Sequence, residues 1–245
     1  EVAGRPPGRA GERNVPGRSM MRVRVLVVLL IALATAGEAA AATAVEHRPE
    51  RLVRAFFSVV FGLEYGGAHA DAQRVKKYAG QVRFHVTDLS SSGRAREAEA
   101  FLRTLPRRIR NLRAGLVRDP AEANFRVILV DRARFPSIVR KVLEADVLAM
   151  GAQCIVGVET RRGRILASTA VIVADDDYLF SRCLVEEVLQ GLGPMNDSRD
   201  LVESVFNDAS RHATFTAFDE ALLNMLYHPA IRPGMTGTEV QRTLP

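Results

Sequence analysis

Cysteine is scarce in this 245-residue chain: only Cys154 and Cys183 are present, and they do not form a C-x-x-C motif. Catalysis by thiol–disulfide exchange is therefore not expected. In an oxidising compartment the two cysteines favour a structural disulfide, with two separately buried thiols as the alternative. No cysteine follows the N-terminal apolar run, so a lipoprotein anchor is not expected either.

Long apolar runs are also lacking. The main one, Val25–Ala36, falls short of the roughly 20 residues that a membrane-spanning helix needs. It follows Arg22 and Arg24 and precedes a stretch of small residues, which together are typical of a secretory signal peptide at about 20–42. The sequence therefore predicts a periplasmic or secreted protein with no stable membrane anchor after cleavage. An uncleaved anchor is the alternative.

The signal peptide divides the chain into parts. Residues 1–19 are rich in Arg, Gly and Pro, and we interpret them as upstream translation from a mis-set start or as residues added in cloning. After the signal peptide comes a poorly defined N-terminal segment, 43–75. Residues 76–245 are long enough for one domain with a sizeable core.

A strong excess of one charge is absent as well. The net charge is +6, and the first 42 residues carry six Arg and three Glu, so half of the excess leaves with the signal peptide. The arginine-rich stretch 94–118 has helical spacing and few aromatic residues, which is typical of a solvated helix face. Nucleic acid is therefore not an expected partner, and contact with a polyanion or a membrane surface is the minor alternative.

The rest of the chain alternates between strand and helix patterns. Strands are predicted at 82–86, 125–131, 154–159 and 165–173, the last two forming a hairpin around 161–164. Helices are predicted at 94–115, kinked or divided by Pro106, and at 135–143, 178–192 and 218–227. This order indicates an α/β (α+β) domain with a mixed sheet and packed helices.

Histidine is missing where a zinc peptidase would need it. Glu186 and Gln190 lie one turn apart on the helix at about 178–192, with Glu187 between them. Zinc peptidases place H-E-x-x-H in such a helix, between a hairpin and a glycine stop, and their glutamate acts on the water. Here Glu187 matches that general base, while Glu186 and Gln190 replace the two histidines.

The motif can be extended to H-E-x-x-H-x-x-G-x-x-H. Gly193 then matches the glycine and Asn196 the third ligand. One carboxylate and two amides suit zinc poorly and would favour calcium or magnesium. The sequence therefore assigns no metal and leaves the cofactor unknown. The alternative without a functional site is that Glu186 forms a surface salt bridge with Arg182 and that Gln190 is an ordinary exposed helix residue.

Several linked motifs carry a family resemblance. They are E-E-x-x-Q-x-L-G followed by Asn196 and Asp197, the string 204–208, the string 216–219, and the string 226–235. Together they resemble the bacterial family called domain of unknown function 2927 (DUF2927), over roughly residues 76–236. The resemblance implies a layout like that of zincin-type metallopeptidases, and it leaves the activity open.

A second cluster adds Tyr227 as a candidate oxyanion stabiliser, His228 as a candidate binding residue, and Met235 as a possible analogue of a methionine turn. His228 is also explained as a cap or turn residue, and the Pro-Gly before Met235 is explained as a turn. The preferred interpretation is a non-catalytic envelope module that binds a peptide or another envelope component. The alternative is a divergent hydrolase, with or without metal, that uses Glu187 as general base. A third is that the acid pair only holds the helix.

Overall fold

The computed structural model describes residues 49–62, 71–145, 151–207 and 209–244, which belong to one compact unit. The predicted signal peptide and the residues before it lie outside this part. Segment 43–75, for which the sequence predicts no element, contains helix α2 (Pro49–Val60). The side chains of Phe56, Val59 and Val60 enter the main core, so α2 is part of the folded unit.

The centre of the unit is a five-stranded sheet in the order β2-β1-β3-β5-β4. The strands are β1 (Val82–Asp88), β2 (Ala114–Leu116), β3 (Phe125–Val130), β4 (Ile155–Arg161) and β5 (Arg164–Val173). All neighbouring pairs are parallel except β4 and β5, which form the predicted antiparallel hairpin. The expectation of an α/β domain with a mixed sheet is confirmed.

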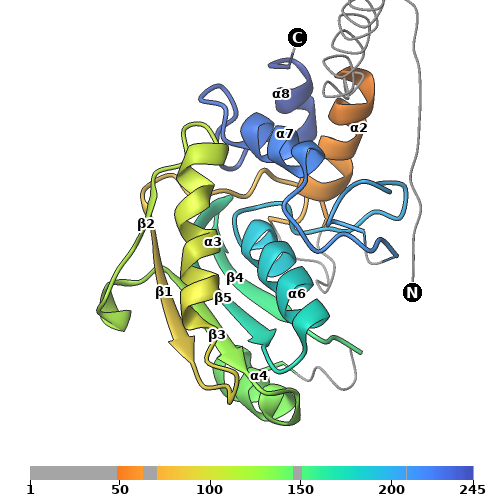
Figure 1. Cartoon of the computed structure of the whole chain (residues 1–245). Helices are drawn as coiled ribbons and strands as arrows, with labels where there is room; N and C mark the ends of the chain where they lie inside the picture. The colour runs from red at the N-terminus through yellow and green to blue at the C-terminus, as the bar shows by residue number, and fades with distance from the viewer. Residues whose placement is uncertain (1–48, 63–70, 146–150, 208, 245) are drawn as a thin grey trace, which may run out of the picture. The chain divides into compact units, whose positions relative to one another are not determined.

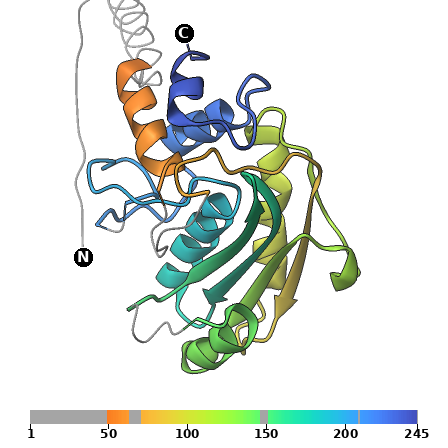
Figure 2. The same cartoon turned by 180° about the vertical axis from the view of Figure 1, so that it is seen from behind.

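Helices cover both faces of the sheet because its central strands are apolar on both sides. In β3, Val127 and Leu129 pack into the main core, whereas Ile128 and Val130 pack into a second, smaller core. The main core holds α3 (Ala95–Arg108) and α6 (Asp177–Gln190), and the smaller one holds α4 (Phe135–Leu143) (Figures 1 and 2).

Three further helices, α2, α7 (Ala217–Leu226) and α8 (Gly237–Gln241), gather beyond one end of the sheet (Figure 1). Helix α7 begins with a capping box between the Thr216 side chain and Asp219. The sequence gives no expectation for α8, which is only five residues long.

One predicted boundary is wrong. The helix expected over 94–115 ends at Arg108, and Ala114–Leu116 form strand β2 instead. Pro106 cannot donate a backbone hydrogen bond, and the helix stops two residues after it. Asn111 then turns the chain with a positive φ of 66°. The short strand β2 pairs with β1 at the edge of the sheet. Three residues are too few to show the alternation of apolar and polar side chains that predicts a strand.

Candidate functional site

Helix α6 follows directly from β5 and is embedded in the protein. Asp176 caps its N-terminus, since its Oδ1 accepts a hydrogen bond of 2.8 Å from the Leu179 amide. From Arg182 to Gln190 every residue of the helix is buried, including the acidic pair. An ordinary surface helix would expose one face, so the polar residues of α6 must find partners inside the protein.

Arg182 and Glu186 form an ion pair, as the four-residue spacing predicts, with 2.8 Å between Nη2 and Oε1. The prediction of a surface bridge is wrong, because less than a tenth of either side chain is exposed. The guanidinium also donates to the backbone carbonyls of Asn207, Ser210 and His212. Arg182 therefore joins the acidic helix to the loop that covers it, which the sequence pattern did not show.

Gln190 is buried as well, and the alternative of an exposed helix residue is wrong. Its Nε2 donates to Oδ1 of Asp197 over 3.0 Å. Asn196, which the sequence analysis aligns with a third zinc ligand, donates its side-chain amide to the Ser58 carbonyl at 2.8 Å. Gln190 therefore contacts the segment that follows α6, through Asp197. Asn196 contacts helix α2, through Ser58.

Glu187 lies beside a disulfide. Cys154 and Cys183 are bonded to each other, which joins the residue before β4 to α6 and excludes two separate thiols. The ligand atoms of Cys154, Glu186 and Glu187 lie within 4.8 Å of one another. This arrangement brings two buried carboxylates together at the predicted base position.

The donor set does not fit zinc. Within the described ranges, this cluster is the one group of three or more His, Cys, Asp or Glu close enough to share an ion. Cys154 has no thiolate to offer while it is in the disulfide, and Glu186 is already paired with Arg182. Structural and catalytic zinc sites need at least three protein ligands, mostly His or Cys. The structure therefore gives no basis for a step through zinc.

Gly193, the motif glycine, has a steric reason. Its φ is +143°, and a Cβ atom there would lie 2.2 Å from the Lys76 carbonyl oxygen. The chain at 74–78 passes directly over the end of α6, so only glycine fits. A glycine at this position is therefore explained by packing against the Lys76 backbone.

Tyr227 lies at the same end of α6. Its hydroxyl donates to the Leu192 carbonyl over 2.9 Å, and burial raises the pKa of this hydroxyl above its ordinary value. His228 is exposed, and its Nδ1 accepts from the Ala230 amide. Met235 is buried, with its Sδ accepting from the Arg232 amide at 3.0 Å. The structure brings Tyr227 close to the C-terminal end of α6, and it leaves His228 at the surface.

Two neighbouring lysines are an important feature that the sequence analysis did not single out. Lys76 donates to backbone carbonyls at the end of α2, including Val60 at 2.9 Å, and Lys77 donates to those of Leu226 and Ile231 at 2.7 Å. Burial lowers the pKa of each lysine to about 8, and the charge of Asp71 opposes this for Lys76. Both remain largely protonated at neutral pH and cap the C-termini of α2 and α7.

Replacing Lys77 with Met should lower the free energy of unfolding by about 2–4 kcal/mol, because buried carbonyls then lose their donor. Urea unfolding followed by circular dichroism measures this. Lys141→Met on the exposed side of α4 is the matched control and should stay within about 0.5 kcal/mol of the parent. Equal effects of the two substitutions would contradict the capping role of Lys77.

Asp219 was also missed as a buried acid, although its spacing from Thr216 is a capping-box signal. Its carboxylate accepts a 2.6 Å bond from the Ser204 hydroxyl and bonds from the Thr216 backbone and side chain. Burial raises the pKa of this carboxyl against the opposing effect of these bonds. Asp219 therefore connects α7 to the loop that carries Ser204.

No helix in the described part of the chain is long and apolar enough to cross a membrane.

Comparison with known proteins gives one match. The family model described as protein of unknown function (DUF2927) matches residues 49–245, which includes α2 and extends beyond the region expected from the motifs. No curated protein and no solved structure matches the chain. Because the matched region spans most of the sequence, this chain belongs to the DUF2927 family.

Proposed function

We propose that the protein is an exported envelope protein whose domain binds a ligand without catalysing a reaction. The observation that carries this proposal is the buried ion pair between Arg182 and Glu186. In this proposal Glu186 takes the place of a metal ligand of the zinc peptidases, and Arg182 of the same helix balances its negative charge. The acidic helix thereby stabilises the domain, and ligand recognition falls to its surface.

A zincin-like scaffold is part of this proposal. The β4–β5 hairpin precedes α6, the helix carries the acidic pair, and Gly193 ends the turn that follows it. This is the setting in which zinc peptidases place their active helix. The domain would then be a relative that keeps the layout while its ligand positions serve packing.

Export is proposed on two grounds. The bond between Cys154 and Cys183 is compatible with an oxidising compartment, where disulfides persist. The basic, apolar and small-residue segments at 20–42 have the order of a signal peptide. A periplasmic or secreted location follows from the two together, with a peptide or another envelope component as partner.

A divergent hydrolase is the second candidate, because the glutamate at the general-base position is kept. Glu187 is buried, and its carboxylate lies within 4.8 Å of that of Glu186. General-base catalysis needs a carboxylate within hydrogen-bond reach of the water that it activates. As a hydrolase, the protein would use Glu187 to activate water. The Tyr227 hydroxyl would stabilise the oxyanion after breaking its hydrogen bond to the Leu192 carbonyl.

A peptide-cleavage assay separates the two candidates. The exported protein, incubated with a mixture of unstructured peptides with and without added zinc, should release no fragments detectable by mass spectrometry. Glu187→Gln should behave like the parent, as should the control Glu99→Gln on α3. Cleavage that a chelator or Glu187→Gln abolishes, while circular dichroism shows an intact fold, would overturn the binding proposal in favour of the hydrolase.

A further inference from the structure

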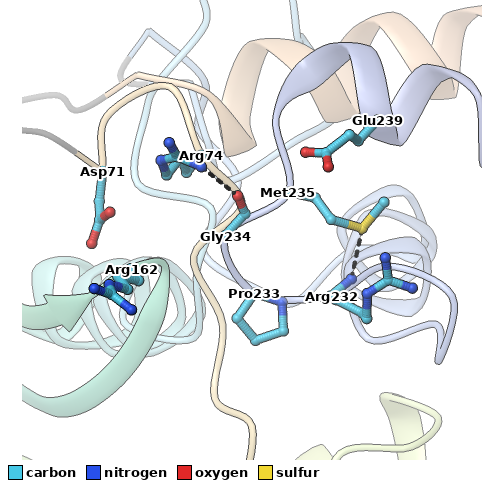
Figure 3. Close-up of a pocket in the computed structure, with 8 residues that line it drawn as sticks. All are labelled: Asp71, Arg74, Arg162, Arg232, Pro233, Gly234, Met235 and Glu239. Atoms are coloured by element: carbon cyan, nitrogen blue, oxygen red, sulfur yellow. Dashed lines mark hydrogen bonds between the residues drawn. The ribbon is translucent and has the colours of Figure 1, made fainter.

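A cavity of about 560 Å³, lined by no residue of α6, lies between the hairpin turn and the C-terminal segment (Figure 3). Its volume falls within the range of small-molecule sites. Three arginines from distant parts of the sequence line it, with Arg74 and Arg162 on one side of the strip 233–235 and Arg232 on the other (Figure 3). The lining residues are Asp71, Arg74, Arg162, Arg232, Pro233, Gly234, Met235 and Glu239.

The backbone around the cavity is held firmly. Val75 exchanges two hydrogen bonds of 2.8 Å with the strip at Gly234 and Met235. The tip of the hairpin packs against the same strip, since a Cβ on Gly163 would lie 2.2 Å from the Gly234 nitrogen. The three segments that carry the arginines are therefore in direct backbone contact, and the cavity is built into the fold.

The two acidic lining residues are occupied within the protein. Asp71 accepts bonds from the Thr160 hydroxyl at 2.8 Å and the Gly163 amide at 3.0 Å. Glu239 accepts from the backbone and hydroxyl of Thr236 as part of a capping box. The carboxylate of Glu239 also interacts electrostatically with Arg232 and Arg74, so it balances part of the positive charge of the cavity.

The arginines keep donors for a ligand. Arg74 uses Nη1 to hold the Gly234 carbonyl at 3.0 Å, which leaves the rest of its guanidinium fork. Among the described residues, the side chains of Arg162 and Arg232 make no hydrogen bond or salt bridge. Figure 3 shows the three side chains placed around the cavity, with Pro233 and Met235 between them.

We infer that this cavity binds the phosphate group of a small phosphorylated ligand. Three arginines line the cavity, and the oxygens of a phosphate can accept from more guanidinium donors than a flat carboxylate can. Pro233 and Met235 provide apolar surface for the organic part of the ligand. The phosphate belongs either to a soluble organic phosphate or to a lipid headgroup.

This inference goes beyond the proposed function, because it assigns a site and a ligand chemistry at a separate surface. None of the lining residues lies on α6, so binding here does not depend on whether Glu187 is catalytic. A failure of either claim leaves the other standing.

Isothermal titration calorimetry on the whole exported protein tests the inference. Glucose 6-phosphate should bind more tightly than inorganic phosphate, and glucose and citrate should bind weakly or not at all. Arg162→Gln and Arg232→Gln should each weaken binding about tenfold or more, as expected for a lost charged hydrogen bond. Both side chains are exposed, so both variants should fold.

Arg164→Gln is the matched control, since Arg164 is exposed on the same hairpin and does not line the cavity. It should leave binding unchanged. Sedimentation with phosphatidylcholine vesicles that contain phosphatidic acid separates the two ligand sources. The site is supported if the protein binds either the soluble organic phosphate or these vesicles, and if Arg162→Gln abolishes that binding. Absence of both, or equal binding by parent and Arg162→Gln, overturns it.

Discussion

Replacing Arg182 with Met should lower the free energy of unfolding by about 3–5 kcal/mol, since it leaves the Glu186 carboxylate buried without its counter-ion. The substitution also removes the donor for the carbonyls of Asn207, Ser210 and His212. Urea denaturation followed by circular dichroism measures the loss. The double variant Arg182→Met with Glu186→Gln should recover the part that is due to the uncompensated charge.

Arg103 on α3 supplies the matched control. It pairs with Glu99 at 2.9 Å with the same four-residue spacing, but the two side chains are 59 % and 36 % exposed. Arg103→Met should therefore cost less than about 1 kcal/mol. A similar small loss for Arg182→Met would show that the pair in α6 is not structurally important, and it would remove the main support for the binding proposal.

Removal of the disulfide is the second large effect. Cys154 and Cys183 are 29 residues apart, and closing a loop of that size should contribute about 3–4 kcal/mol by restricting the unfolded chain. The variant with both cysteines changed to Ala should be less stable by that amount. Thermal unfolding with and without reductant supplies the measurement.

The parent under reducing conditions is the control for this variant, because it lacks the bond but keeps both side chains. Its stability should fall toward that of the double Ala variant. If the parent is equally stable with and without reductant, and mass spectrometry confirms that the bond is broken, the disulfide does not stabilise the domain.

The sequence predicted the elements whose signals are local. Strand β3 is a continuous apolar run, β4 and β5 flank a turn at Arg162 and Gly163, and α7 begins at the cap residue Thr216. Strand β2 has three residues, and its existence depends on pairing with β1. Such an element carries too little local pattern to be found before the sheet is known.

The candidate site was predicted only in part, for a related reason. The spacing of Arg182 and Glu186 gave the ion pair, but it could not give its burial, which depends on a loop 25 to 30 residues further along. Nothing in the sequence indicated that Lys77 is buried, because its carbonyl partners Leu226 and Ile231 lie about 150 residues away along the chain. The cavity arginines also come together only through the fold.

The metal content of untagged protein purified from the periplasm, measured together with its peptide cleavage, tests the central claim most directly. The claim is that the ligand-equivalent positions of α6 serve packing and that the domain binds without catalysis. We predict no stoichiometric zinc or other transition metal and no cleavage of peptides. One tightly held ion per chain, with cleavage that stops when the ion is removed, would contradict it.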